Sequence, residues 1–336
     1  MKGKSAAILA ASAVLVLTAC SAAPKTQDTA VNETIVWKCG LANPESHSTA
    51  VAAQAMADYI YEKTNGRYRI DIHPSSQLGN ENDLIESVKL GTLQFSFAST
   101  SVMTNYVPEL GALDLPFVIE SEEHADRAIY DSSSEANQFF TDAVEHAGFK
   151  CFAFVEQGFR NVMSSVPVET IDSLHGLKIR TMENPLHLEL WAALGASPIP
   201  LSSGDTLPAL QQGTVDAVEM ANARLVTNGF SDVASYYTET RHLYTVGIYT
   251  MNPKCYESLS DEDKKIFDEA AQLCIETCNE LNRSQDAEYF EQIKNSPNVK
   301  GTFEIPVSAL EPLVQKVYDA HPEYNDSIAL IKKYSE

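Results

Sequence analysis

The chain has 336 residues, of which 46 are acidic and 24 are lysine or arginine, so its formal net charge is −22. This balance excludes the nucleic-acid binders as a class, because they need clustered basic side chains and no basic patch occurs in the sequence. A hydrophobic content of 44% indicates a well-packed globular body. About 300 residues remain after the N-terminal segment, more than one core usually holds, which favours two domains.

The first twenty residues have the pattern of a targeting segment. Lys2 and Lys4 precede an apolar run over residues 6–17 that is too short to span a bilayer comfortably. The run leads into L-T-A-C at 17–20, which resembles the lipobox of lipoproteins. We therefore expect a lipoprotein signal peptide over 1–20, with Cys20 acylated after cleavage and the protein held outside the cytoplasm by its lipid. The alternative is an ordinary secretory signal with an incidental cysteine.

Residues 21–33 are small and polar, which predicts a flexible tether between the lipid and the folded chain. Strand and helix patterns then alternate. They predict strands over 34–39, 67–73, 94–99 and 149–156, helices over 48–63 and 81–90, and two further helices near 121–147. The repeated strand–helix–strand order favours largely parallel sheets flanked by helices.

The alternation continues from about Gly158 to Tyr244. Residues 177–180 form a short apolar strand that ends in Arg180, and Asn184-Pro185 opens a helix after it. The remaining pattern predicts a strand-rich return over 243–252, a helix capped by Ser260 that reaches about Asn295 either unbroken or with one break, a strand within 299–306, and terminal helices over 308–335. A helix as long as the one after Ser260 suits an element that crosses both domains.

Four spaced motifs lie between residues 160 and 219, and two of them contain an arginine at the edge of a short apolar strand. They are Arg160 itself, D-S-L-H-G-L-K-I-R at 172–180, L-G-A-S-P-I-P at 194–200 and A-L-Q-Q-G-T-V-D-A-V-E at 209–219. In this order they resemble the solute-binding proteins of the tripartite ATP-independent periplasmic (TRAP) transporters, the C4-dicarboxylate-binding DctP family. Further marks of that family are T-N-G-R at 64–67, H-P-S-S-Q-L-G at 73–79, Gly91 and L-P-F at 115–117, so the resemblance covers about residues 34–330.

The resemblance implies an α/β fold, namely the two-domain periplasmic-binding-protein type II architecture with an interdomain cleft and a long connecting helix. Domain I is expected over 34–157 plus about 246–285, and domain II over 158–245 plus about 286–336. The implied function is to capture a small organic acid anion outside the cytoplasm and deliver it to TRAP membrane permease subunits. We expect a monomer that needs no cofactor.

Arg180 is the principal ligand residue that the resemblance implies. A guanidinium presents a planar fork to a carboxylate, which the ammonium of lysine cannot do. Arg160 matches a second family arginine near the cleft, and a structural ion pair at the domain border is its alternative role. Glu219 ends a predicted strand and could accept a hydrogen bond from a ligand hydroxyl or only brace Arg180.

Other cleft positions follow from the family pattern with less support from the residues themselves. Ser99 and Thr100 end a strand where other members place a polar contact, although capping of the strand end would also explain them. Ser203 falls where many members have an aromatic residue packed on the ligand. Met220 falls where many have an asparagine, and Asn222 could substitute for it. These departures put C4-dicarboxylates and sialic acid in doubt as ligands. They do not affect the expected contact between Arg180 and a ligand carboxylate.

The sequence gives little support for a metal site or for enzyme activity. The five cysteines other than Cys20 are odd in number and cannot form a complete intrachain disulfide framework. Cys274 and Cys278 share the apolar face of a predicted helix, where we expect buried small side chains rather than a metal pair. The chain lacks the nucleophile-elbow, zinc-protease, phosphate-loop and redox C-x-x-C motifs, so neither an enzyme nor a metal site is expected.

Three alternative functions stay open at this point. A binding protein of an ATP-driven importer shares the fold class, and a sensor component that presents its ligand to a membrane receptor would use the same cleft. A cell-surface lyase or hydrolase is disfavoured because no nucleophile–base constellation stands out in the sequence.

The N-terminal motif predicts that Cys20→Ala abolishes lipid attachment. Without the sulfur that carries the lipid, the protein should leave the membrane fraction or stay unprocessed. Metabolic labelling with a radioactive fatty acid and fractionation of cells check this, and Cys39→Ala serves as the control. Lipid labelling of Cys20→Ala at the level of the unchanged protein would contradict the prediction.

Overall fold

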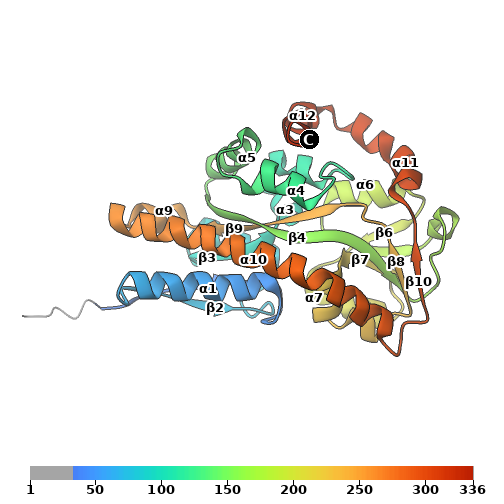
Figure 1. Cartoon of the computed structure of the whole chain (residues 1–336), viewed down its shortest axis with the longest axis horizontal. Helices are drawn as coiled ribbons and strands as arrows, with labels where there is room; N and C mark the ends of the chain where they lie inside the picture. Colours follow the sequence, from blue (N-terminus) through green and yellow to red (C-terminus); the bar gives the residue numbers. More distant parts are fainter. Residues whose placement is uncertain (1–32, 336) are drawn as a thin grey trace, which may run out of the picture. The chain divides into compact units, whose positions relative to one another are not determined.

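The computed structural model describes residues 33–335, so the expected signal peptide with Cys20 and nearly all of the tether lie outside the described residues. The strands are β1 (Ile35–Gly40), β2 (Tyr68–His73), β3 (Phe95–Ser99), β4 (Lys150–Ser164), β5 (Lys178–Thr181), β6 (Ser197–Pro200), β7 (Ala217–Ala221), β8 (Tyr236–Glu239), β9 (Tyr244–Met251) and β10 (Gly301–Glu304). The α-helices are α1 (Ser48–Lys63), α2 (Glu81–Leu90), α3 (Thr100–Met103), α4 (Glu122–Ala125), α5 (Glu135–His146), α6 (Pro185–Ala193), α7 (Ser203–Gln211), α8 (Asn222–Thr227), α9 (Pro253–Glu257), α10 (Asp261–Asn295), α11 (Val307–Ala320) and α12 (Asn325–Lys332). Figure 1 shows their arrangement.

Local capping signals explain why the helices begin and end where the sequence predicts. Asn80 and Asp83 form a reciprocal capping box at the start of α2, and Gly91 ends that helix in the left-handed conformation at φ 81°. The Ser260 hydroxyl accepts the Asp263 backbone N–H, 3.1 Å away, at the start of α10. The bounds of α1 and α2 therefore agree with the prediction residue for residue.

The strands of residues 33–335 are hydrogen-bonded in the order β2-β1-β3-β9-β4-β7-β5-β6, with β8 beside β4 and β10 beside β8. The outer pairings are parallel, as expected from the strand–helix alternation. The prediction of largely parallel sheets was nevertheless wrong at the centre, where β4 and β9 make antiparallel pairs. The reason is topological: β4 carries the chain out of the first sheet and β9 brings it back, so the two strands run in opposite directions.

β4 joins the two sheets. Residues up to Phe159 pair with β9 in the first sheet, and residues from Arg160 onward pair with β7 in the second. The register shifts between Glu156 and Gly158, where the glycine has φ 89°. The sequence predicted a strand end at 156, but the structure shows a bulge through which the strand continues. Arg160 thereby stands at the crossing between the sheets.

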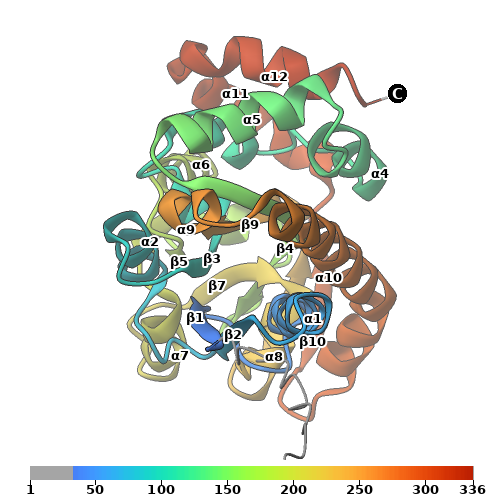
Figure 2. The ribbon, with the colours of Figure 1, turned by 90° about the vertical axis from the view of Figure 1, so that its left-hand side faces the viewer.

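The long helix α10 runs as one uninterrupted element of 35 residues, without the break that the sequence left open. It packs against α1 and β4 and, further along, against α8 (Figures 1 and 2). Phe267 and Cys278 near its first half are buried in one core, whereas Ile293 near its end is buried in another. A single helix therefore connects the packing of the two sheets.

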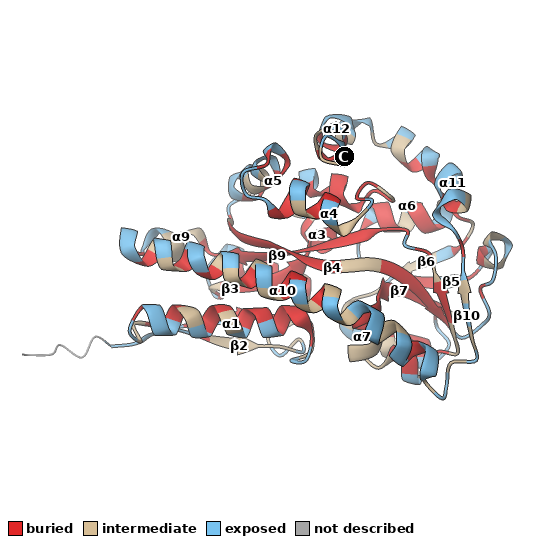
Figure 3. Ribbon diagram, viewed as in Figure 1, coloured by how far each residue is buried: buried red, intermediate tan, exposed pale blue. Residues whose placement is uncertain are grey.

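Three apolar clusters fill the described chain, and the strands are its most buried elements (Figure 3). One cluster contains Trp37 and the buried Cys274, and lies among β1, β3, α1 and α10. A second contains Met163 and Phe230 of the later section. The largest runs along both sheets and includes residues of α2, α5, α6 and α11. The cysteines of the described residues are free thiols, and Cys39, Cys151, Cys274 and Cys278 are buried, as expected for small apolar side chains.

Among residues 33–335, every helix is either too short or too polar to serve as a membrane span.

Close contact between β3 and β9 predicts that Gly247→Ala destabilises the fold. An added methyl group would come within 2.6 Å of the Phe97 ring carbons. Overpacking of this kind costs about 1–3 kcal/mol of unfolding free energy. Gly204→Ala is the matched control, because a methyl group there meets nothing within 4 Å. Urea unfolding of both variants measures the effect, and equal midpoints for the two would contradict the prediction.

Candidate ligand-binding site

The candidate site takes its residues from β4 and β7 and from the ends of β3 and β5. The strands β3, β5 and β7 each lead within four residues into a helix, α3, α6 or α8 respectively. Charged side chains gather here although the chain buries them almost completely. Arg160, Arg180, Arg224, Glu81 and Glu219 each expose at most 6% of their surface. Buried charges need partners, and the pairing among these five groups decides what the site can bind.

Arg160 and Glu219 form a two-pronged ion pair. The Arg160 Nη2 donates to Glu219 Oε1 at 2.8 Å, and its Nε donates to Oε2. The antiparallel register of β4 and β7 places Arg160 opposite Ala221, two residues from Glu219. Such a planar fork-to-carboxylate contact is the strongest kind of side-chain hydrogen bonding available to arginine.

Two histidines complete the surroundings of Glu219. His242 Nε2 lies 3.1 Å from Glu219 Oε2, and His187 Nδ1 lies 3.8 Å from Oε1. Burial by itself would raise the pKa of Glu219, but the charge of Arg160, the hydrogen bond with His242 and the nearby His187 outweigh it and hold the pKa well below its usual value. Glu219 is therefore an ionised group that is already fully engaged.

Arg180 has no such partner. Its Nε donates to the Leu201 backbone oxygen at 2.9 Å, and its Nη2 donates to the same oxygen. Among residues 33–335, no carboxylate oxygen lies within 4.0 Å of its guanidinium. Burial lowers the pKa of Arg180 to about 9, with Glu219 opposing the shift and the positive charges of Arg160 and Arg224 adding to it. Arg180 is thus a desolvated cation that needs an anion.

Arg224 and Glu81 meet across the site from different parts of the chain. Arg224 Nη1 lies 3.8 Å from Glu81 Oε1, and its Nη2 donates to the Ser203 hydroxyl. Glu81 Oε2 in turn accepts the Ser99 backbone N–H at 2.8 Å. Burial lowers the pKa of Arg224, with Glu81 opposing the shift. The contact joins α2 and β3 of the first sheet region to α7 and α8 of the second.

The structure brings together four of the residues proposed from sequence, namely Arg160, Arg180, Ser99 and Glu219, and it places Ser203 beside them. Glu219 pairs with Arg160 and not with Arg180, which was one of its two expected partners. The Thr100 hydroxyl donates to the Val246 backbone oxygen at 2.9 Å and is committed there.

Two proposed positions lie elsewhere. Met220 packs in the apolar cluster on the opposite face of β7 from Glu219, because successive side chains of a strand alternate between its faces. The Asn222 amide is held by Asn161, Tyr237 and Asp286. Neither residue is therefore carried into the proposed ligand site.

Glu81, Arg224 and His187 are the cluster members that sequence reasoning missed. Glu81 follows the Q-L-G motif by two residues, and Arg224 follows Glu219 by five. Those short distances from family motifs were the available signals. Neither spacing reveals a contact between α2 and α8, which tertiary packing alone creates.

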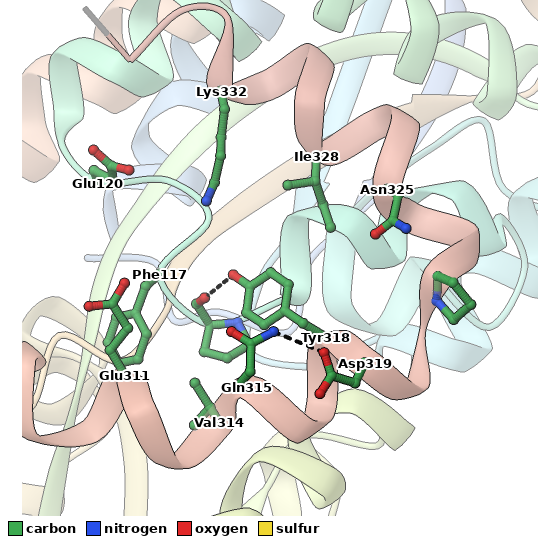
Figure 4. Close-up of a pocket in the computed structure, with 12 residues that line it drawn as sticks. Phe117, Glu120, Glu311, Val314, Gln315, Tyr318, Asp319, Asn325, Ile328 and Lys332 are labelled. Carbon is green, nitrogen blue, oxygen red and sulfur yellow. Dashed lines mark hydrogen bonds between the residues drawn. The ribbon is translucent and has the colours of Figure 1, made fainter.

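A separate surface groove of about 530 Å³ lies between α11, α12 and the segment 116–120 (Figure 4). The Tyr318 hydroxyl donates to the Pro116 backbone oxygen along one side. Glu120, Glu311 and Lys332 line it, but none of the clustered arginines does. Within residues 33–335, no group of three or more His, Cys, Asp or Glu side chains has the geometry of a metal site.

Comparisons with known proteins agree on one family. The sequence profile of the bacterial extracellular solute-binding proteins, family 7 (DctP), matches residues 39–325. The solute-binding protein of Verminephrobacter eiseniae is 32% identical over 235 residues, which cover 70% of this chain and 69% of that protein.

Two solved structures have the same fold. A TRAP periplasmic solute-binding protein from Polaromonas sp. JS666, bound to D-erythronate, superposes with a TM-score of 0.84 at 29% identity and covers 89% of this chain and 98% of its own. A TRAP periplasmic solute-binding protein from Bordetella, with density interpreted as pantoate, gives the same score and identity over 90% of this chain and 99% of its own. These likenesses confirm the two-domain periplasmic-binding-protein fold that was predicted.

The engaged state of Glu219 predicts that Glu219→Gln destabilises the protein. A neutral amide leaves Arg160 buried without its charge partner, which costs about 3–5 kcal/mol of unfolding free energy. Glu189→Gln is the control, because the exposed pair of Glu189 and His321 should contribute no more than about 1 kcal/mol. Chemical unfolding at neutral pH measures both, and a loss below about 1 kcal/mol for Glu219→Gln would contradict the assignment.

The effect of Glu219→Gln on stability should also depend on pH. The folded pKa of Glu219 lies below its unfolded pKa, so the stabilisation is fully present above the unfolded value and is lost as the pH falls through the folded value. The stability difference between the unchanged protein and Glu219→Gln should therefore shrink in acid. A difference in unfolding free energy that grows as the pH falls would contradict the prediction.

Proposed function

Because this chain belongs to the bacterial extracellular solute-binding proteins of family 7, the TRAP-type DctP family, we propose that it captures a small organic acid anion and delivers it to a TRAP permease. Capture of a small acid outside the cytoplasm is the role of this family. The identity of the transporter, and the lipid at Cys20 that would hold the protein beside it, are parts of the proposal. The family consists of binding proteins rather than enzymes.

The observation that carries the proposal is the unpaired charge of Arg180. Glu219 is occupied by Arg160 and two histidines, so the guanidinium of Arg180 is the buried cation of the cluster that lacks a carboxylate. A ligand carboxylate would supply the missing negative charge in a desolvated place, where a bidentate contact is both strong and directional. The ligands assigned in the two solved relatives described above, D-erythronate and pantoate, are both carboxylates.

We further propose that domains I and II, as bounded in the sequence analysis, close around the ligand as hinged bodies. β4 and β9 would be the hinge, since both strands pass between the domains. Three contacts support a closed arrangement in the described chain. They are Arg224 with Glu81 at 3.8 Å, Asn184 Nδ2 with the Ser101 backbone oxygen at 2.7 Å, and Asn105 Nδ2 with the Glu183 backbone oxygen at 3.0 Å.

Replacement of Arg180 tests the proposed function. Arg180→Ala should weaken binding of the best acid by about 2–5 kcal/mol, since one partner of a buried charge pair is lost. Arg180→Lys should also lose much of the affinity, because an ammonium keeps the charge but not the fork. A thermal-shift screen of organic acids finds the ligand, and titration calorimetry measures each variant.

Two further readouts make this test specific. Arg69→Ala is the control, because Arg69 is an exposed arginine paired with Asp71 on β2. Without ligand, Arg180→Ala should unfold no more easily than the unchanged protein, because it removes a buried cation that lacks an ionic partner. If folded Arg180→Ala binds within about threefold of the unchanged protein, the carboxylate is held elsewhere.

A further inference from the structure

The imidazole of His187 lies between two carboxylates and is itself buried, with 1% of the residue exposed. Its Nε2 lies 3.4 Å from Asp114 Oδ1, and its Nδ1 lies 3.8 Å from Glu219 Oε1. The Nδ1 has no hydrogen-bond partner within the described part of the chain, residues 33–335. A buried polar atom without a partner is rare in native proteins and calls for an explanation.

Asp114 accepts three hydrogen bonds besides its contact with His187. Its Oδ2 accepts the Thr104 hydroxyl at 3.0 Å and the Asn184 Nδ2 at 3.1 Å, and its Oδ1 accepts the Ser101 hydroxyl. An ionised carboxylate offers only acceptors, so these three donors match it. The His187 nitrogen that faces Asp114, Nε2, therefore carries a proton and donates it.

The second nitrogen of His187 differs between the neutral and the charged ring. In the neutral ring Nδ1 is an acceptor, and its lone pair faces another acceptor, Glu219 Oε1. In the charged ring Nδ1 carries a proton that points toward this carboxylate. Burial by itself would lower the pKa of His187, but the hydrogen bond with Asp114 and the nearby Glu219 outweigh it and raise the pKa above its usual value. The surroundings of the ring therefore favour the imidazolium.

The other charged groups around His187 come from elements beside α6. Arg160 of β4 and His242, which precedes β9, reach it through Glu219. Burial lowers the pKa of His242, with Glu219 opposing the shift, so that ring is neutral. Both β5 and α11 also pack against α6. The strand β5 contributes Arg180, whereas the charged residues of α11 are exposed.

The protonation of His187 decides the net charge of the buried site. With the adjoining Asp114, the site holds three arginines and three carboxylates, namely Arg160, Arg180, Arg224, Glu81, Glu219 and Asp114. Their charges cancel while His187 is neutral, and one positive charge remains when it is protonated. A bound ligand carboxylate adds one negative charge, which the imidazolium compensates. Because uncompensated charge is costly in a buried place, each of the two events favours the other.

Glu219 physically connects the two events. Its charge acts on the guanidinium of Arg180 and on the imidazole of His187. A ligand carboxylate at Arg180 adds negative charge beside this carboxylate and makes the neighbourhood of His187 more favourable for a cation. His187 thus acts through Glu219 rather than by touching the ligand.

We propose that the binding of a carboxylate at Arg180 is coupled to the protonation of His187 at Nδ1, so that the protein captures an organic anion together with a proton. The proton comes from the solvent, and the charge that it brings faces Glu219 and Asp114. No proton is taken up where the free protein already holds it. This inference rests on the proposed function, because it presumes that Arg180 binds the ligand carboxylate.

Calorimetry in buffers of different ionisation enthalpy detects the proton without any variant. D-Erythronate, the acid in the solved relative from Polaromonas, serves as the probe. Between the pKa of His187 in the free protein and its pKa in the complex, the binding enthalpy should depend on the buffer, because a proton is taken up. The affinity should fall by up to about tenfold per pH unit as the pH rises across this range. A binding enthalpy that is equal in all buffers from about pH 6 to pH 8.5 would overturn the proposal.

His187→Gln assigns the proton to this residue. The glutamine amide can donate to Asp114 as Nε2 does, but it cannot become charged. The variant should bind D-erythronate with an enthalpy that does not depend on the buffer and with an affinity that changes little with pH. Proton uptake that persists in His187→Gln would overturn the assignment.

His321→Gln is the matched control. His321 also lies between two carboxylates, with Glu189 at 2.7 Å and Glu323 at 2.9 Å, but at the end of α11 and outside the cluster of buried charges. This variant should keep the proton uptake of the unchanged protein. If its loss of uptake equalled that of His187→Gln, the coupling would not belong to the buried site.

A measurement without ligand tests the charge of His187 independently of the acid. The pKa of His187 is higher in the folded than in the unfolded chain, so its stabilisation is fully present below the unfolded value and is lost as the pH rises through the folded value. The unfolding free energy of the unchanged protein relative to His187→Gln should therefore decrease with rising pH. A relative stability that stays constant or increases would show that His187 does not bind the proton.

The proposed function and the coupling fail in different ways. If Arg180→Ala abolishes binding but the unchanged protein binds D-erythronate without proton uptake, the carboxylate site stands and the coupling is wrong. If Arg180→Ala leaves the affinity unchanged, the carboxylate is held elsewhere and both are wrong. If D-erythronate does not bind to the folded, unchanged protein, both are wrong for this acid.

Discussion

The rest of the site depends on the buried ion pair between Arg160 and Glu219. Arg160 stands where β4 passes from one sheet to the other, and Glu219 reaches it from the neighbouring strand. Because two histidines also contact Glu219, its negative charge is fully used within the cluster. Arg180 is therefore left as a buried cation beside an already neutralised pair. The proposed affinity of this site for an anion thus rests on how the protein satisfies its own carboxylate.

The continuous backbone of β4 makes this arrangement possible. A strand that ended at Gly158 would place Arg160 in a separate loop, but the bulge there bends β4 and carries it into the second sheet. The antiparallel return of β9 and the long helix α10 tie the two sheet regions together on either side of this crossing. The hinge that we propose in β4 and β9 would therefore lie beside the proposed binding place of the ligand carboxylate.

An acidic protein that binds an anion must overcome the electrostatic repulsion between its own negative charges and the ligand. The net charge of −22 repels anions at long range, yet three arginines converge within a few side chains of one another. Exclusion of water makes these local charges act more strongly than the screened charges of the surface.

The sequence by itself determined the bounds of α1 and α2, the motifs that contain Arg180 and Glu219, and the family. Capping residues such as Asn80, Gly91 and Ser260 act over a few positions, and the motifs that contain Arg180 and Glu219 are contiguous. It could not show that Glu219 pairs with Arg160 or that Met220 faces away, because both depend on the register between β4 and β7. Glu81 and Arg224 come from separate elements, α2 and α8, and only tertiary packing makes them neighbours. Capping residues and motifs can be recognised in the linear sequence, whereas the pairing of the buried charges arises only when the chain folds.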